Sequence, residues 1–336
     1  MRYNRGMRPV FADPRTDFVF KRIFGGRPSG SDPHKHLLME LLNALLELEG
    51  DRLLKEIVFL PPGQTVQLPE MKLSIVDVKC RDQRDTEYVV EMQLFNVKGF
   101  EERVVYNASK TFVMQLRTAE DYPNLNDVVG VTICDFSLWP DPPPLGDPAV
   151  PMLSRWRMRE EHSGAKGLGQ IQYVFLELDK YAGGPQPVGI LNKWAFFFRE
   201  AENLEVIPPE LDEEPFREAL EVARMAGFSE AELELYDRSK MAEQDARGAL
   251  ELAASQGRSE GLAEGRSEGL AEGRSEGLAE GLRHNVEDVC ELLAIELTRE
   301  RRDFLANATV PEPEALRARI KRDRRWDHPG GPTGSP

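Results

Sequence analysis

Two short segments, residues 74–79 and 89–94, constrain the fold of this chain more than any other feature. Both are rich in β-branched and apolar residues and are joined by the polar turn 81–85, so we predict an antiparallel pair of strands. If the hairpin centres in the middle of that turn, Asp77 lies almost directly across from Glu91. Two acidic side chains from neighbouring strands are therefore expected to meet.

Strand alternation defines what surrounds these two acids. Glu91 and Gln93 point the same way, and the apolar residues between and beside them, among them Met92, point to the opposite face. Carboxylate oxygens, with the Met92 carbonyl as a further ligand, suit a hard divalent cation and hence metal-assisted hydrolysis of a phosphodiester. Gln93 would hold the attacking water by hydrogen bonding. The alternative is that Asp77 and Glu91 are merely solvated strand residues.

Composition and length describe a globular chain without an obvious membrane or disulfide context. It has 336 residues, 40% of them hydrophobic and 30% charged, which predicts one or two soluble domains. Its three cysteines are scattered and form no CxxC pair, so neither a disulfide framework nor a zinc site is expected. The N-terminus lacks the apolar stretch of a signal peptide, and no run approaches the roughly 20 apolar residues of a membrane span. A cytoplasmic location follows.

The formal net charge of −15 argues at first against nucleic acid, because DNA binding depends largely on phosphate neutralisation. The charge is unevenly spread, however. Residues 1–30 carry a local charge of +5, residues 201–250 carry −9, and residues 317–325 carry +5. A nucleic-acid substrate for the N-terminal half is therefore not excluded. The basic segment 317–325 is either a DNA-contacting arm or a solubilising end.

The order of predicted elements favours layers of α and β structure. Thr16–Gly25 reads as a short amphipathic helix that stops at its glycine, and a leucine-rich helix follows. The remaining predicted elements are a strand at 57–60, the hairpin, a helix at 99–118, and strands at 128–136 and 172–178. An aromatic stretch at 191–198 is expected to pack on the same core.

From about residue 208 the chain becomes acidic and helical, with a predicted capping box formed by Ser229 and Glu232, and it then repeats itself. The eight residues that start at Gly257 recur at Gly265 and Gly273 and are closed by Gly281. Each helical glycine costs about 1 kcal/mol relative to alanine, so this helix is expected to need a partner. We therefore predict a homo-oligomer formed through the C-terminal helices. The alternative is a duplicated, solvated helix without a role in assembly.

The order Asp77, then Glu91-Met92-Gln93 after a charged turn, resembles the core of the PD-(D/E)XK nuclease superfamily. Over residues 12–285 the chain more closely resembles the Rpn family of recombination-promoting nucleases and transposases. The other matching pieces are Asp17-Phe-Val-Phe-Lys21, Phe24-Gly25, Arg103 with Tyr106 and Lys110, Tyr122, the aromatic stretch around 194–198 and the Glu-Gly repeat.

The resemblance implies an α/β, restriction-endonuclease-like core with a mixed sheet flanked by helices, followed by a C-terminal α-helical region. It also implies a metal-dependent DNA endonuclease with Asp77 and Glu91 as catalytic residues, Mg²⁺ as the metal and Mn²⁺ as an alternative. The setting would be recombination, a mobile element or phage defence. Two other functions remain open: an inactive nuclease fold that binds DNA or acts like an antitoxin, and a self-associating scaffold built on the glycine repeat.

One position departs from the superfamily pattern, whose motif ends in lysine where this chain has Gln93. Arg103, Tyr106 and Lys110 share one face of the predicted 99–118 helix. We expect Lys110 or Arg103 to approach the phosphate in place of the motif lysine, with Tyr106 as a weaker nucleic-acid contact. Salt bridges of these cations with the neighbouring glutamates are the alternative.

Lys21 lies four residues after Asp17, which predicts a local ion pair at the start of a helix. The alternative is that the pair completes the metal site, with Lys21 as a further weak contact to nucleic acid. The expected organisation is a basic arm at 1–11, the nuclease-like domain at 12–200, acidic helices at 208–256, the repeat helix at 257–281, a helix and basic segment at 282–325 and a disordered tail at 326–336.

Overall fold

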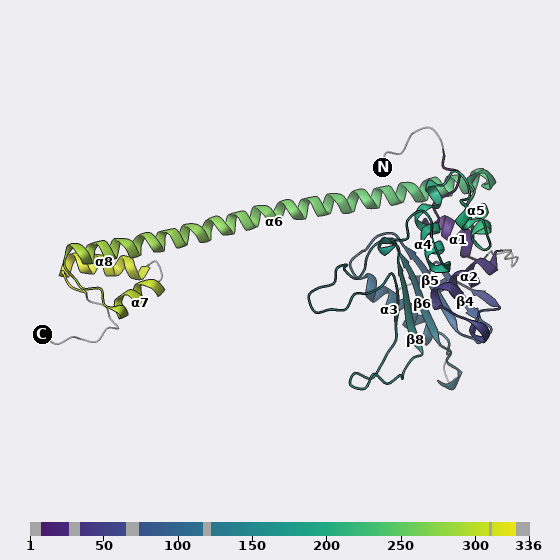
Figure 1. The fold of residues 1–336 in the computed structure, drawn as a ribbon, viewed down its shortest axis with the longest axis horizontal. Coiled ribbons are helices and arrows are strands. Elements are labelled where there is room, and N and C mark those ends of the chain that lie inside the picture. Colours follow the sequence, from purple (N-terminus) through teal and green to yellow (C-terminus); the bar gives the residue numbers. More distant parts are fainter. Residues whose placement is uncertain (1–7, 27–33, 65–73, 117–121, 309–310, 327–336) are drawn as a thin grey trace. The chain divides into compact units, whose positions relative to one another are not determined.

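The computed structural model describes residues 8–26, 34–64, 74–116, 122–308 and 311–326. The chain divides into two compact units, Met1–Arg247 and Gly248–Pro336 (Figure 1). The helices of the first unit are α1 (Asp17–Phe24), α2 (Lys35–Leu46), α3 (Phe100–Val113), α4 (Ile190–Glu200), α5 (Phe216–Ala223) and the beginning of α6 (Glu230–Leu292). None of the described helices is both long and apolar enough to cross a membrane.

The first unit is built on a mixed six-stranded sheet in the order β1-β4-β5-β6-β8-β7. The strands are β1 (Ile57–Leu60), β4 (Val78–Asp82), β5 (Glu87–Gln93), β6 (Val128–Cys134), β7 (Leu153–Trp156) and β8 (Ile171–Glu177). Strands β5, β6 and β8 run parallel, and the other neighbours pair antiparallel. The predicted mixed sheet flanked by helices is thereby confirmed.

The predicted hairpin forms, but its first strand begins later than expected. Strand β4 starts at Val78, and its register pairs Val78 with Val90. Ser74–Ile75 forms a separate strand, β3, which pairs with β2 (Gly63–Gln64) in a two-stranded sheet. The backbone N–H of Val76 donates to the carbonyl of Pro62 at 3.2 Å, which draws this segment away from β5. The chain then bends at Asp77, directly before β4.

Helices cover both faces of the sheet (Figure 1). On one face, α3 packs against β5, β6 and β8, with Val89 in the interface. On the other face, Val90 and Met92 join a large core to which α1, α2, α4 and α5 contribute. The predicted alternation along β5 is therefore confirmed. The face that carries Glu91 lies under α3, so it is more enclosed than a polar, solvated strand face would be.

The larger core is aromatic and is centred on Trp194 of α4. The Trp194 ring lies 4.8 Å from that of Phe216, 5.6 Å from Phe197 and 5.8 Å from Phe24, measured between centroids. Phe24 belongs to α1, which starts after an N-cap at Thr16. The helix ends before Gly25, as predicted. The core therefore fixes the position of α1, whose exposed side reaches the candidate site.

Helix α6 begins after a capping box, as predicted. The Ser229 hydroxyl accepts from the backbone N–H of Glu232 (3.3 Å), and the Glu232 carboxylate accepts from the N–H of Ser229 (2.8 Å). The helix then continues without interruption to Leu292, so the acidic segment and the glycine repeat form one helix rather than separate ones. A Cβ atom built at any repeat glycine would have no neighbour within 4 Å among the described residues.

This open space around the glycines leads to a prediction. Replacing Gly261, Gly269 and Gly277 together by alanine is expected to stabilise α6 by up to about 1 kcal/mol per site, because alanine has the higher helix propensity and meets no obstacle. Circular dichroism at 222 nm and the thermal midpoint of the full chain should both rise. A lower midpoint together with a lower mass in sedimentation would instead mean that another copy packs against the glycines.

Candidate active site

Asp77 directly precedes β4, at the point where β5 extends beyond the first residue of β4. Its Oδ2 atom accepts a hydrogen bond from the backbone N–H of Met92 at 2.8 Å. The Gln93 carbonyl accepts from the N–H of Asp135 at 2.9 Å, so the Gln93 backbone faces β6. Successive residues of a strand direct their backbone groups to opposite neighbours, so both backbone groups of Met92 face the β4 side. The Asp77 carboxylate thus substitutes for a missing strand partner, and the Met92 carbonyl is directed to the same edge.

A lysine from α1 meets this carboxylate. The Nζ atom of Lys21 lies 3.4 Å from Asp77 Oδ1 and also forms an ion pair with Asp17. Burial raises the pKa of Asp77 to about 7, although the Met92 hydrogen bond and the charge of Lys21 act in the opposite direction. Burial lowers the pKa of Lys21, but Asp17 and Asp77 raise it by more, so Lys21 stays charged. The cost of removing the Asp77 carboxylate from water is therefore only partly offset by the Met92 hydrogen bond and the charge of Lys21.

Glu91 is held on the neighbouring strand by α3. It is buried, and its Oε1 atom accepts from Asn107 Nδ2 at 2.5 Å. Burial raises the pKa of Glu91, while the Asn107 hydrogen bond and the charge of Arg103 lower it. Sequence reasoning overlooked Asn107, although it lies four residues after Arg103 and so on the face already singled out.

From the sequence, Asp77, Glu91 and Gln93 are expected to share one face of the sheet. Glu91 and Gln93 both bond residues of α3, but the Asp77 carboxylate bonds the backbone of β5 instead. The hairpin register, continued by one residue, places Asp77 opposite Glu91, but the two carboxylates have different surroundings. Glu91 faces Asn107 under α3, whereas Asp77 lies at the edge between β4 and β5 and reaches Lys21 of α1. The bend at Asp77 and its bond to Met92 break the regular alternation.

Gln93 is engaged with the protein on both sides of its amide. Its Nε2 atom donates to the Phe95 carbonyl at 2.9 Å, and its Oε1 atom accepts from Arg103 at 2.5 Å. Arg103 is otherwise exposed and bonds Gln93 rather than the neighbouring glutamates. Gln93 therefore fits the role of an anchor better than the predicted role of holding a water. As an anchor, it directs the Arg103 cation toward the end of β5.

The structure does not support the predicted approach of Lys110 to the phosphate. Lys110 is buried on α3, and its Nζ atom lies 5.5 Å from the centre of the Tyr106 ring. The positive charges that act on the pKa values of Glu91 and Asp77 come from Arg103 and Lys21 respectively. Arg103 therefore keeps its predicted place near the site, and Lys21 joins it.

The candidate donor atoms are all oxygen atoms, which suits a hard divalent cation. Asp77, Glu91 and the Met92 carbonyl offer oxygen ligands, and both carboxylates are desolvated enough to favour a nearby cation. Among the described residues, no three His, Cys, Asp or Glu side chains are grouped closely enough to bind a metal by themselves. A Mg²⁺ ion here would complete its shell with water and substrate phosphate, which is usual for this metal.

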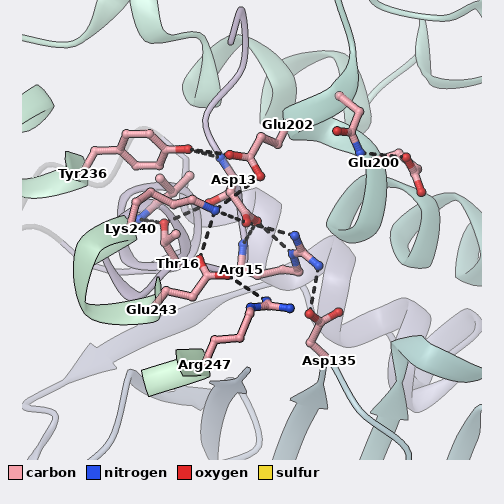
Figure 2. A network of polar contacts seen from close by, with 12 residues as sticks. Asp13, Arg15, Thr16, Asp135, Glu200, Glu202, Tyr236, Lys240, Glu243 and Arg247 are labelled. Atoms are coloured by element: carbon pink, nitrogen blue, oxygen red, sulfur yellow. Dashed lines mark hydrogen bonds and ion pairs between the residues drawn. The ribbon is translucent and has the colours of Figure 1, made fainter. Parts of the chain in front are cut away.

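A hollow of about 530 Å³ opens beside Asp17 and Lys21, between α1 and the first turns of α6. Next to it, α6 is anchored by a buried polar network (Figure 2). At its centre, Asp13 accepts from Arg15 at 2.9 Å and from Lys240 of α6 at 3.1 Å. Arg15 also bonds Asp135 at 2.9 Å, the residue whose N–H holds the Gln93 carbonyl. The network thus connects α6 to the end of β5.

Comparison with known families gives the class of the protein. A family model for PD-(D/E)XK nuclease family transposases matches residues 14–253, which is most of the chain. The chain therefore belongs to the PD-(D/E)XK nuclease family transposases, and the family expected from its motifs is confirmed. The matched range contains the mixed sheet, Asp77, Glu91 and the first part of α6. Neither a curated protein nor a solved structure matched the chain.

Proposed function

We propose that this protein is a metal-dependent DNA endonuclease whose active centre is formed by Asp77 and Glu91. The observation that carries the proposal is the half-buried Asp77 carboxylate, fixed by the Met92 N–H at the point where the hairpin register brings Glu91 onto the facing strand. Membership of a PD-(D/E)XK nuclease family supports it, because the matched range contains Asp77 and Glu91, the two acids that resemble the superfamily motif. Cytoplasmic DNA in a recombination, mobile-element or phage-defence setting is the proposed substrate.

The chemistry divides between the metal and the side chains. Asp77, Glu91 and the Met92 carbonyl would hold Mg²⁺, with Mn²⁺ as the alternative, and the bound ion supplies an activated water and neutralises developing negative charge. Lys21 provides the cation that the family motif takes from the position of Gln93, because its ammonium lies beside Asp77. Arg103, anchored by Gln93, presents a second cation to the phosphate backbone. The hollow beside Lys21 gives the substrate access.

The test is cleavage of supercoiled plasmid by purified protein. With Mg²⁺ or Mn²⁺ we expect conversion to open-circle or linear DNA, and with EDTA the plasmid should stay supercoiled. Conversion that continues in EDTA would contradict the metal requirement. If the plasmid stays intact with either metal but the protein still binds DNA, the alternative of an inactive DNA-binding module would be favoured. The replacement of the motif lysine by Gln93 leaves that alternative open.

Lys21 provides a prediction of its own. Lys21→Met is expected to lower the cleavage rate about 100-fold, because it removes an electrostatic contact that stabilises the transition state. Lys21→Arg keeps the charge and should retain a larger part of the rate. Since Lys21 is proposed to act on the reacting phosphate, the loss should appear in kcat rather than in KM. Equal rates for the methionine variant and the wild type would remove Lys21 from the mechanism.

A further inference from the structure

The C-terminal unit contains a folded helical group with its own core. The end of α6, α7 (Arg299–Asn307) and α8 (Pro311–Asp323) pack around Val286, Cys290, Leu305, Leu316 and Ile320. Leu316 and Ile320 are four residues apart and face this core. The packing therefore determines which side of α8 is turned outward.

Positive charge collects at the C-terminal end of α8 and directly after it. Lys321, Arg322, Arg324 and Arg325, which we call the basic end of α8, are all exposed. Lys321, Arg324 and Arg325 form no ion pair with any residue that the structure describes, whereas Arg322 pairs with Asp323 at 2.9 Å. Three of the four cations thus remain available to a partner.

The lowered pKa of Asp323 reflects the positive charge that surrounds it. The hydrogen bond from Arg322 lowers the pKa of Asp323, and the charges of Arg325 and Arg319 lower it further. The segment 317–325 carries +5 in a chain whose net charge is −15. Positive charge concentrated in this way on a folded surface suits a polyanion with regularly spaced phosphates.

We propose that the basic end of α8 binds the phosphate backbone of DNA, as a second DNA contact apart from the candidate active site. The inference rests on the proposed function in taking DNA as the partner. Lysine and arginine contacts to phosphates carry no sequence preference, so this surface would add affinity rather than specificity. Because it belongs to the same chain as the nuclease unit, it would also raise the effective concentration of DNA at that unit.

The experiment measures DNA binding by the full chain in EDTA, where no metal-dependent cleavage can occur. Fluorescence anisotropy of a labelled 30-base-pair duplex is recorded over a series of NaCl concentrations. The variant is Lys321→Gln with Arg324→Gln and Arg325→Gln. The matched control is Arg258→Gln with Arg266→Gln and Arg274→Gln, which removes the same charge from exposed positions of α6. Circular dichroism checks that both proteins fold.

We expect the affinity of the α8 variant to fall at least tenfold, and the slope of log K against log salt to become shallower by about 2 to 3, since each lost phosphate contact removes about 0.9. A variant with Lys321→Arg alone should bind like the wild type. If the α8 variant and the α6 control show the same slope, the proposal is overturned. It is also overturned if the α8 variant loses binding to phosphatidylserine vesicles but not to DNA.

This result is independent of cleavage. Asp77→Ala should abolish plasmid nicking and leave the salt slope unchanged, whereas the α8 variant should change the slope and retain nicking at saturating DNA. A failure of the nuclease proposal and a failure of the α8 proposal would therefore be told apart.

Discussion

Asp77→Ala is expected to reduce the rate of plasmid nicking by about 1,000-fold or more, which corresponds to about 4 kcal/mol of transition-state stabilisation. The variant removes a proposed metal ligand and also the acceptor of the Met92 N–H, so neither the ion nor the edge of β5 would be held. Its DNA affinity in EDTA should stay close to that of the wild type, because the loss of a negative charge does not weaken binding to phosphates.

Asp85→Ala is the matched control for this prediction. Asp85 is an exposed aspartate in the turn of the same hairpin, and its only ion pair among the described residues is a 3.9 Å contact with Arg81. Its removal should leave the nicking rate unchanged. Comparable rates for Asp77→Ala and Asp85→Ala would place the chemistry outside this hairpin.

Trp194→Ala is expected to produce the largest loss of stability, about 3 to 5 kcal/mol, because it empties the centre of the aromatic core. Phe216 of α5 would lose its ring contact at 4.8 Å, and Phe24 of α1 would lose one of its ring contacts. Urea unfolding monitored by circular dichroism measures the free energy directly. Because this core positions α1, Lys21 should also be displaced from Asp77. The cleavage rate of the variant should therefore fall below that of the wild type.

Trp194→Phe separates the contribution of ring volume from that of the indole N–H. The indole N–H is buried without a hydrogen-bond partner among the described residues, so its removal should be nearly free of cost. The phenylalanine variant is expected to lose less than half as much stability as the alanine variant. Equal losses for both variants would mean that the pocket depends on the polar end of the indole rather than on its packing.

The sequence predicts local structure here well, because the decisive signals are local. The capping box at Ser229, the start of the helix at Thr16 and the alternation along β5 all involve residues within a few positions of one another. Each fixes a helix start or a strand face without help from the rest of the fold. The family resemblance added the mixed sheet, which a single sequence does not otherwise specify.

The details of the site depend on contacts that are distant in the sequence. Lys21 reaches Asp77 because the aromatic core fixes α1, and the i, i+4 spacing of Lys21 and Asp17 predicts only their own pair. The bend at Asp77 depends on the bond between Val76 and Pro62, which pattern reasoning cannot foresee. Lys110 shared the expected helix face but lies buried beside Tyr106. Helical periodicity gives the face of a residue and does not give its depth.

The dependence of the cleavage rate on Mg²⁺ concentration tests the central claim most directly. A labelled duplex is cut under single-turnover conditions by the wild type, by Glu91→Asp and by Glu91→Gln. The proposal predicts a rate that saturates with Mg²⁺ for the wild type, a weaker apparent Mg²⁺ affinity for Glu91→Asp, and no measurable rate for Glu91→Gln. Identical Mg²⁺ curves for all three proteins would contradict a metal site that includes Glu91.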